Sequence, residues 1–198
     1  MIILENIRYR ILEIEKLSIP SGITAVIGDN GAGKTTFLRI CAGMDLPTGT
    51  VTINGVTPRE CEVGYVSEFP DRHMIFSVVQ DEIASPLRFS RKNSDEVSAS
   101  VLAVAEKLNI THLLDRDCKT LSGGEKMLIG VATALVAKPV LLVMDEPDSH
   151  LDPETSAELF TIIRESGCPH VLWSTHAKKI IQHADQIIEL TQGRVNES

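Results

Sequence analysis

The stretch from Gly28 to Thr36, which reads Gly-Asp-Asn-Gly-Ala-Gly-Lys-Thr-Thr, constrains the fold of this chain more than any other part of it. It matches the phosphate-binding loop pattern G-x-x-x-x-G-K-[ST]. The apolar run at 23–27 directly before it predicts a buried strand, and residues 35–42 after it predict a helix. Because the pattern requires this order of strand, glycine loop and helix, we expect a helix that begins at a phosphate site.

The residue types of the loop suit a bound nucleotide. Glycines let backbone N–H groups close around phosphate oxygens, and the N-terminus of the following helix adds partial positive charge. Lys34 can place a cation on the β- and γ-phosphates, and the hydroxyl of Thr35 can bind Mg²⁺. We expect the whole loop to lie at the phosphates: Gly28, Asp29, Asn30, Gly31, Ala32, Gly33, Lys34, Thr35 and Thr36.

Strand patterns surround the loop, and a helical region interrupts them. Residues 2–9 and 11–19 predict two strands, and 51–53 and 63–66 predict two shorter ones. The middle of the chain, from about residue 69 to 137, is mostly helical, and strand and helix alternate again after it. We therefore expect an α/β core with an inserted helical lobe.

Two helices are expected early in this lobe. Val78 to Ala84 predicts a short helix that ends before Pro86. A longer helix is expected to begin at Asn93, because Glu96 lies at capping-box spacing and apolar residues then recur on one face.

A second pair of glycines follows at the start of a later helix. Ser122 and Glu125 have the spacing of a capping box, which makes Ser122 the expected N-cap. Gly123 and Gly124 then fall in the first turn, at a cost of about 1 kcal/mol each relative to Ala. The pair is either tolerated in an ordinary cap or leaves bare backbone for an anion. The phosphate loop earlier in the chain favours the anion.

Two carboxylates and a histidine follow buried strands. Asp145 and Glu146 come directly after the apolar run 140–144, at the strand end where α/β sheets bind ligands. Asp145 can hold Mg²⁺, and Glu146 can orient or deprotonate an attacking water. His176 follows the next apolar run. A lone histidine is more often structural, but this position favours a contact to the γ-phosphate.

Composition limits the class of protein. The net charge of −8 argues against broad nucleic-acid binding. The four cysteines are scattered and predict free, reduced thiols in a cytosolic protein. Because we find neither a signal peptide nor an apolar run of about 20 residues, any link to a membrane is expected to pass through a partner.

The ordered set of motifs resembles the ATP-binding cassette (ABC) ATPases over nearly the whole chain. The phosphate loop at 28–36 is the first motif, and 121–125 resembles the family's signature motif. Residues 140–146 resemble the Walker B strand with its catalytic glutamate, 149–152 resemble the D-loop, and His176 resembles the switch histidine.

This resemblance implies both a fold and a mechanism. The fold is a P-loop NTPase of the ABC type: a mainly parallel core sheet, an antiparallel β part near the N-terminus and an inserted helical lobe. Two copies pair head to tail around two ATP molecules, and the motion of the pair drives membrane subunits in transporters. In each ATP site, one copy supplies Lys34, Thr35, Asp145, Glu146 and His176, and the other supplies Ser122, Gly123 and Gly124.

Two positions depart from the family pattern or leave it open. Glu68 lies where the Q-loop glutamine is expected, and it would add a charge while still offering oxygen to Mg²⁺ or water. Tyr9 is a candidate for stacking on adenine, and a plain strand residue is an equal alternative. Residues 70–86 weakly resemble the ATPases of cobalt and other energy-coupling-factor importers.

Three functions are consistent with these motifs. The leading hypothesis is the ATPase subunit of a transporter, which would be cytoplasmic and peripheral on the inner face of the cell membrane. A soluble ABC ATPase, for example of the iron–sulfur assembly type, is the alternative. A nucleotide-binding module without turnover is the third, and Glu146 and His176 argue against it.

Overall fold

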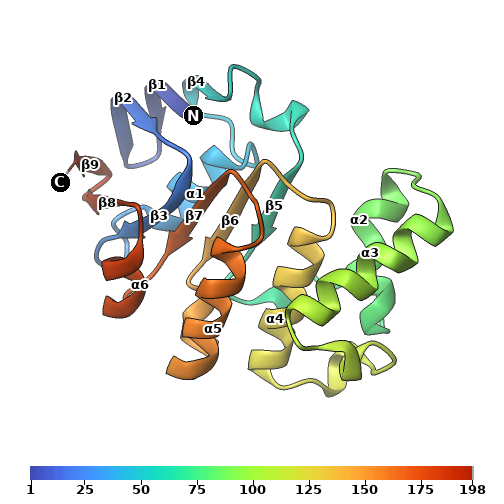
Figure 1. Ribbon diagram of the computed structural model, residues 1–198. Helices are drawn as coiled ribbons and strands as arrows, with labels where there is room; N and C mark the ends of the chain where they lie inside the picture. Colours follow the sequence, from blue (N-terminus) through green and yellow to red (C-terminus); the bar gives the residue numbers. More distant parts are fainter. Residues whose placement is uncertain (198) are drawn as a thin grey trace.

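The computed structural model describes residues 1–197 and arranges them around two β-sheets (Figure 1). The larger sheet has six strands in the order β5-β6-β7-β3-β8-β9. All neighbours are parallel except β8 and β9, which are antiparallel. The strands are β3 (Gly22–Ile27), β5 (Val63–Val66), β6 (Leu141–Asp145), β7 (His170–Ser174), β8 (Gln186–Thr191) and β9 (Arg194–Glu197).

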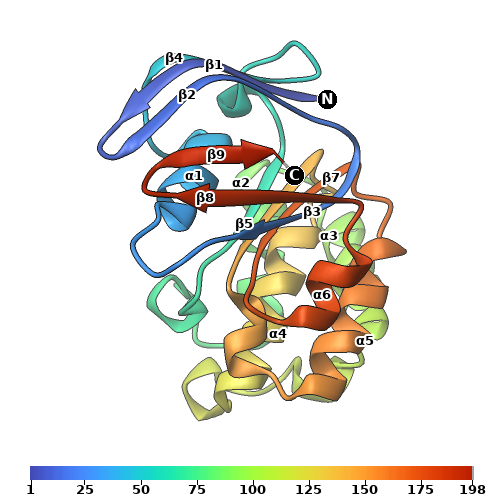
Figure 2. The same ribbon diagram turned by 90° about the vertical axis from the view of Figure 1, so that its left-hand side faces the viewer.

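The smaller sheet is antiparallel and comes mostly from the N-terminal part of the chain. Its order is β2-β1-β4, with β1 (Ile2–Tyr9), β2 (Leu12–Ile19) and β4 (Thr48–Ile53). Both partners of β1 are antiparallel to it. Figure 2 shows this sheet on the side of the larger sheet that carries α1, away from α4 and α5.

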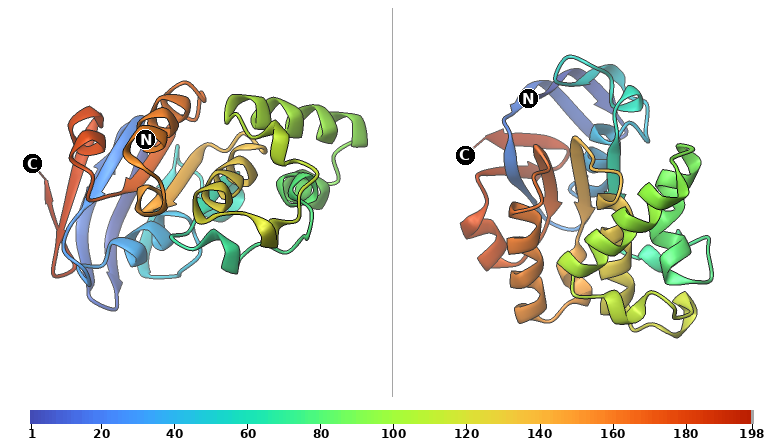
Figure 3. Two further views of the ribbon diagram at one scale, coloured as in Figure 1. Left: turned by 90° about the horizontal axis from the view of Figure 1, so that it is seen from below. Right: turned by 45° about the vertical axis from the view of Figure 1, so that its right-hand side comes forward.

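Six α-helices and five short 3₁₀ turns complete the fold of residues 1–197. The helices are α1 (Lys34–Cys41), α2 (Val79–Phe89), α3 (Ser94–Lys107), α4 (Gly123–Leu135), α5 (Pro153–Arg164) and α6 (Lys178–His183). The turns are η1 (Pro58–Glu60), η2 (Pro70–Arg72), η3 (Thr111–Leu113), η4 (Cys118–Thr120) and η5 (Pro147–His150). The right-hand view of Figure 3 shows α2 and α3 at one side of the molecule, beyond α4. None of the helices within residues 1–197 is long and apolar enough to cross a membrane.

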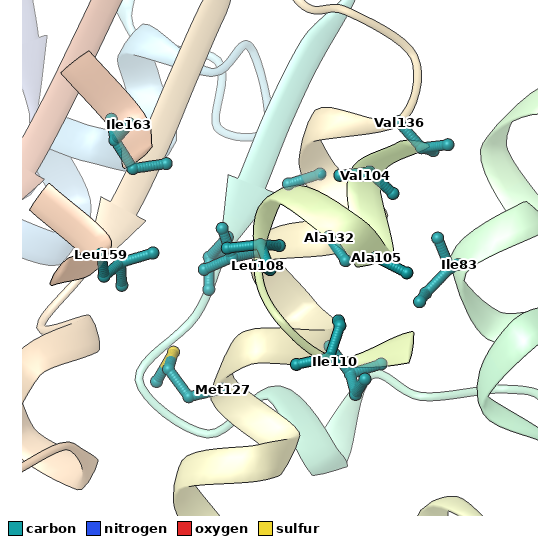
Figure 4. Close-up of a cluster of buried hydrophobic side chains, with 14 of the residues drawn as sticks. Ile83, Val104, Ala105, Leu108, Ile110, Met127, Ala132, Val136, Leu159 and Ile163 are labelled. Carbon is teal, nitrogen blue, oxygen red and sulfur yellow. The ribbon is translucent and has the colours of Figure 1, made fainter. Parts of the chain in front are cut away.

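The two faces of the larger sheet bury separate hydrophobic clusters. Side chains alternate along a strand, so Leu141 and Val143 face α1 and the smaller sheet, whereas Leu142 and Met144 face the helices α2 to α5. Figure 4 shows part of the helical cluster, to which α2 contributes Ile83, α3 contributes Ala105 and α4 contributes Met127. The strand β6 is therefore buried on both faces, as its continuous apolar run predicts.

The predicted α/β class, with a mainly parallel core sheet and an antiparallel N-terminal part, is confirmed. The helices α2, α3 and α4 follow one another between β5 and β6. All four cysteines carry free thiols, as their spacing predicts.

Two local predictions are wrong. The helix expected to stop at Ala84 continues through Pro86 to Phe89. The proline removes one backbone hydrogen bond, worth about 1 kcal/mol. Burial of Ile83 and Leu87 on either side of it offsets this loss. The helix α3 begins after Asn93 as predicted, but the Asn93 side chain accepts from the N–H of Asp95 instead of forming a box with Glu96, which pairs with Lys92.

Candidate functional site

The site lies at the edge of the larger sheet where the parallel strands end. β5, β6, β7 and β3 are neighbours, so the residues that follow them meet at one edge. Glu68 follows β5, Glu146 follows β6, His176 follows β7, and the loop 28–33 follows β3. The sequence places these residues far apart, and the parallel sheet brings them together.

The glycine loop has positive φ at its glycines and leads directly into α1. Gly33 is the N-cap of α1 with φ 106°, and within the described chain no side chain caps this helix. Gly28 has φ 147°, and a Cβ there would lie 2.3 Å from the carbonyl oxygen of Leu190. The loop borders a hollow of about 480 Å³, lined by Arg10, Ile11, Asp29, Asn30, Gly31, Gly33, Lys34, Thr35, Thr36, Glu68 and Glu146.

Lys34 is the centre of the charged contacts. Lys34 is only 6% exposed. The ammonium donates to the carbonyl of Gly28 at 2.9 Å, lies 3.2 Å from His176 Nε2 and pairs with Glu146 Oε1 at 3.3 Å. His176 Nε2 is in turn 3.5 Å from the same Glu146 oxygen. One cation, one carboxylate and one imidazole thus meet at Lys34 from α1 and from the segments after β6 and β7.

Ser174, at the end of β7, holds the two adjacent carboxylate residues. Its hydroxyl donates to Asp145 Oδ1 at 2.7 Å and accepts from the backbone N–H of Glu146 at 2.9 Å. Asp145 is 4% exposed, while Glu146 takes a left-handed backbone conformation with φ 49°. This turn sends the Glu146 side chain to Lys34, and the two carboxylates are separately fixed.

Asp148 is a polar residue of this region that sequence reasoning missed. Its Oδ1 accepts from Trp173 Nε1 at 2.9 Å, and its Oδ2 accepts from the Thr175 hydroxyl at 2.7 Å. A signal existed, because a tryptophan in a buried strand needs an acceptor for its N–H. The sequence did not indicate which residue would supply it.

The N-terminus of α4 forms the predicted capping box. Ser122 Oγ accepts from the N–H of Glu125 at 3.2 Å, and Glu125 Oε2 accepts from the N–H of Ser122 at 2.7 Å. These bonds, with the backbone N–H of Ser122 first, lower the pKa of the Glu125 carboxyl. Ser122 and Gly123 are exposed, and this segment is not part of the lining of the hollow at Lys34 within residues 1–197.

Two other residues were expected at the site, Glu68 and Tyr9, and the structure places them differently. Glu68 lies beside the glycine loop, where it lines the same hollow as Glu146. Tyr9 instead packs partly against the cluster under the smaller sheet, with the Arg10 guanidinium 5.4 Å from its ring centre. The two residues that follow Tyr9 in the sequence, Arg10 and Ile11, line the hollow. The stacking of Tyr9 on adenine stays a prediction.

The family model described as ABC transporter matches residues 15–149. The energy-coupling factor transporter ATP-binding protein EcfA1 of Symbiobacterium thermophilum is 33% identical over 184 residues, which are 86% of this chain and 64% of that protein. The tungstate uptake system ATP-binding protein TupC of Peptoclostridium acidaminophilum is 32% identical, over 95% of this chain and 91% of that one. The lipoprotein-releasing system ATP-binding protein LolD of Colwellia psychrerythraea is 27% identical, over 96% and 80%.

Two solved structures share the fold over nearly the whole chain. CbiO1 of Clostridium perfringens, part of the ABC transporter complex CbiONQ, has a TM-score of 0.87 at 24% identity, over 98% of this chain and 86% of that one. The cassette MJ0796, a dimer in a post-hydrolysis state with ADP and phosphate, has a TM-score of 0.87 at 22% identity, over 100% and 98%.

Proposed function

The chain belongs to the ABC transporter family, and from this premise we propose that it binds and hydrolyses ATP as a subunit that powers a membrane transporter. The observation that carries the proposal is the meeting of Lys34, Glu146 and His176 beside the glycine loop. A buried lysine, a carboxylate and an imidazole at such a loop suit phosphoryl chemistry. In this proposal residues 1–198 form a single ATPase domain, and about 69–137 is its helical lobe.

ATP would enter by exchanging one set of contacts for another. Lys34 now balances its charge with Glu146 and the carbonyl of Gly28. The β- and γ-phosphates would take over the Lys34 ammonium and the open N–H groups at the start of α1. Glu146 is then released from its ion pair and is free to face an attacking water.

The oxygen ligands of the site fit a magnesium ion. Thr35 offers a hydroxyl, and Asp145 and Glu68 offer carboxylates from β6 and from the segment after β5. Hard oxygen ligands of this kind are those that Mg²⁺ prefers. We assign these three residues to the ion, which neutralises phosphate charge when it is bound. Glu68 adds a negative charge that a glutamine at this position would not.

In the hydrolysis step, Glu146 polarises the water and His176 contacts the γ-phosphate. Both are already within 3.5 Å of each other, and both lie beside the lysine that the phosphates would contact. Their starting geometry therefore needs little rearrangement. Ser174 fixes the backbone of Glu146, so the Glu146 carboxylate can turn while its backbone stays in place.

A second ABC ATPase chain would complete each site. Ser122, Gly123 and Gly124 sit at an accessible helix N-terminus, away from the hollow of their own chain. A head-to-tail partner, identical or related, would bring this segment to the γ-phosphate. The cassette MJ0796, which shares the fold, is a dimer, and this supports pairing of two chains. ATP binding closes the pair, and hydrolysis opens it.

Integral membrane subunits are the further partners in this proposal. A hollow of about 360 Å³ lies between β5, α2 and α4, and Ile75 at its rim is 66% exposed. Such an apolar opening beside the helical lobe suits a docked helix. The protein would then sit at the inner face of the membrane. The relatives named above belong to an energy-coupling factor transporter, a tungstate uptake system and a lipoprotein-releasing system, so their names do not converge on one cargo.

Purification of the tagged protein from its native membranes tests this function. We expect an integral membrane protein in stoichiometric amount, together with ATP turnover by the recovered complex. Recovery with soluble partners, or alone, while ATP is still hydrolysed would contradict the transport role. Binding of ATP without turnover would contradict the enzymatic role.

A further inference from the structure

Asp148 joins the two segments that carry the proposed catalytic side chains. It lies in η5, two residues after Glu146, and both of its hydrogen-bond donors come from the end of β7, directly before His176. We propose that Asp148 is a positioning residue that fixes Glu146 and His176 relative to each other. The inference rests on the proposed ATP hydrolysis.

The first contact anchors the carboxylate. Trp173 Nε1 donates to Asp148 Oδ1 at 2.9 Å. Trp173 is fully buried and packs beside the ring of Phe160, so its indole cannot turn to another acceptor without disturbing the helical cluster. A buried N–H also needs a partner. Oδ1 is therefore held in one place.

The second contact reaches the turn that contains His176. The Thr175 hydroxyl donates to Asp148 Oδ2 at 2.7 Å and accepts from the N–H of Ala177 at 2.9 Å. The residue between Thr175 and Ala177 is His176. Because Thr175 is fully buried and bound on both sides, Asp148 sets the backbone from which the imidazole projects.

The strand β7 thus holds the carboxylate loop from both of its faces. Ser174 points to one face and binds Asp145 and the N–H of Glu146. Trp173 and Thr175 point to the other face and bind Asp148. Loss of Asp148 would leave the Ser174 contacts and the backbone pairing of β6 with β7, and η5 could then shift relative to His176.

This arrangement separates chemistry from nucleotide binding. The glycine loop and Lys34 belong to β3 and α1, and the bonds of Asp148 run instead to β7. A change at Asp148 should therefore lower kcat while the KM for ATP stays close to the wild-type value. A purely structural residue would affect stability without this split.

The test uses Asp148→Ala and Thr175→Val in the full chain, assembled with its partners. A displacement of about 1 Å can cost about 100-fold in rate, so we expect Asp148→Ala to lower kcat by about 10- to 100-fold with KM within about twofold. Asp148→Asn should retain the contact to Trp173 and lose the acceptor for Thr175, with a smaller effect. The double variant should be no slower than Asp148→Ala, because both changes break one chain of contacts.

Asp185→Ala is the matched control. Asp185 also accepts two hydrogen bonds, from the N–H of Ile23 at 2.8 Å and from Arg164 at 3.0 Å, but it lies at the opposite end of the sheet. It should lower the melting temperature and leave kcat unchanged. Trp173 is the one tryptophan of the chain, so its emission reports the lost bond in Asp148→Ala and should not shift in Asp185→Ala.

Two results would overturn the inference. One is a folded Asp148→Ala variant whose kcat is within twofold of wild type. The other is a double variant whose loss is the product of the two single losses. Absence of ATP turnover in the wild-type assembly would instead contradict the proposed function, so the two failures are distinct.

Discussion

Two helices of this chain begin at glycines, and the two beginnings are built in opposite ways. At α1 the glycines have positive φ, and no side chain of the described residues caps the helix. At α4 Gly123 and Gly124 have ordinary helical backbone, and Ser122 and Glu125 form a complete capping box.

The difference shows where each glycine requirement comes from. A Cβ at Gly28 would lie 2.3 Å from a backbone oxygen of the same chain. A Cβ at Gly124 would lie 3.4 Å from the carbonyl oxygen of His150, and one at Gly123 would lie 4.0 Å from the ring of that histidine. The chain's own fold therefore requires a glycine at position 28, at the start of the loop before α1. At α4 the chain's own contacts leave room for a Cβ, so we infer that the glycines are required by a molecule that approaches from outside.

Lys34→Ala has the largest expected effect, a loss of ATP affinity at the glycine loop before α1. It removes the cation from the hollow, so ATP affinity should fall at least about 1,000-fold, or about 4 kcal/mol. Titration of the purified variant with a fluorescent ATP analogue measures this. Lys107→Ala, on the lobe, is the control and should bind as wild type. Unchanged affinity in Lys34→Ala would contradict the assignment of the glycine loop.

Gly28→Ala is the next largest effect, and it acts on stability. The left-handed backbone and the contact with Leu190 should together cost at least about 2 kcal/mol, and the variant should melt several degrees lower. Thermal unfolding without nucleotide measures the effect. A melting temperature equal to that of wild type would show that the fold does not impose this glycine.

Gly124→Ala should have the opposite sign on stability. Alanine is the better helix former by up to about 1 kcal/mol, and the surrounding contacts leave room for its methyl group. The isolated chain should therefore be slightly more stable, while ATP hydrolysis falls because the methyl group would meet the partner's nucleotide. A destabilised variant, or a stabilised one with full hydrolysis, would remove the contrast between the two glycine segments.

The smallest expected effect concerns acid. The Ser122 backbone N–H holds the pKa of Glu125 below its ordinary value of 4.5, so its carboxylate stabilises the fold above pH 4.5. This stabilisation is lost as the pH falls through the folded pKa. The stability advantage of wild type over Glu125→Gln should be present at neutral pH and disappear in acid. The start of α1 has no acidic residue and should show no such loss. An advantage that is as large in acid, where the fold is still intact, as at neutral pH would contradict the role of the charge.

Much of this fold can be predicted from the sequence, because its signals are local. The runs at β3 and β6 are apolar at nearly every position, and only a strand buried on both faces requires that. The capping box at Ser122 also lies within four residues of sequence. Each of these features appears in the structure where its pattern predicts it.

The features that the sequence did not predict correctly depend on tertiary contacts. Pro86 remains inside α2 because buried neighbours on both sides of it outweigh one lost hydrogen bond. Asp148 is paired with residues 25 and 27 positions away, so local patterns gave no sign of it. The candidate site was easier, since the parallel sheet places the ends of β3, β6 and β7 together whatever their separation in sequence.

The mass of Glu146→Gln in solution with ATP and Mg²⁺ tests the central claim most directly. Without the carboxylate that polarises water, bound ATP should persist and hold two copies together through their α4 segments. We expect the mass of a dimer with ATP, and a lower share of dimer when Gly124→Ala is added. A variant that binds ATP and remains at the mass of one chain would contradict a head-to-tail site between two identical chains.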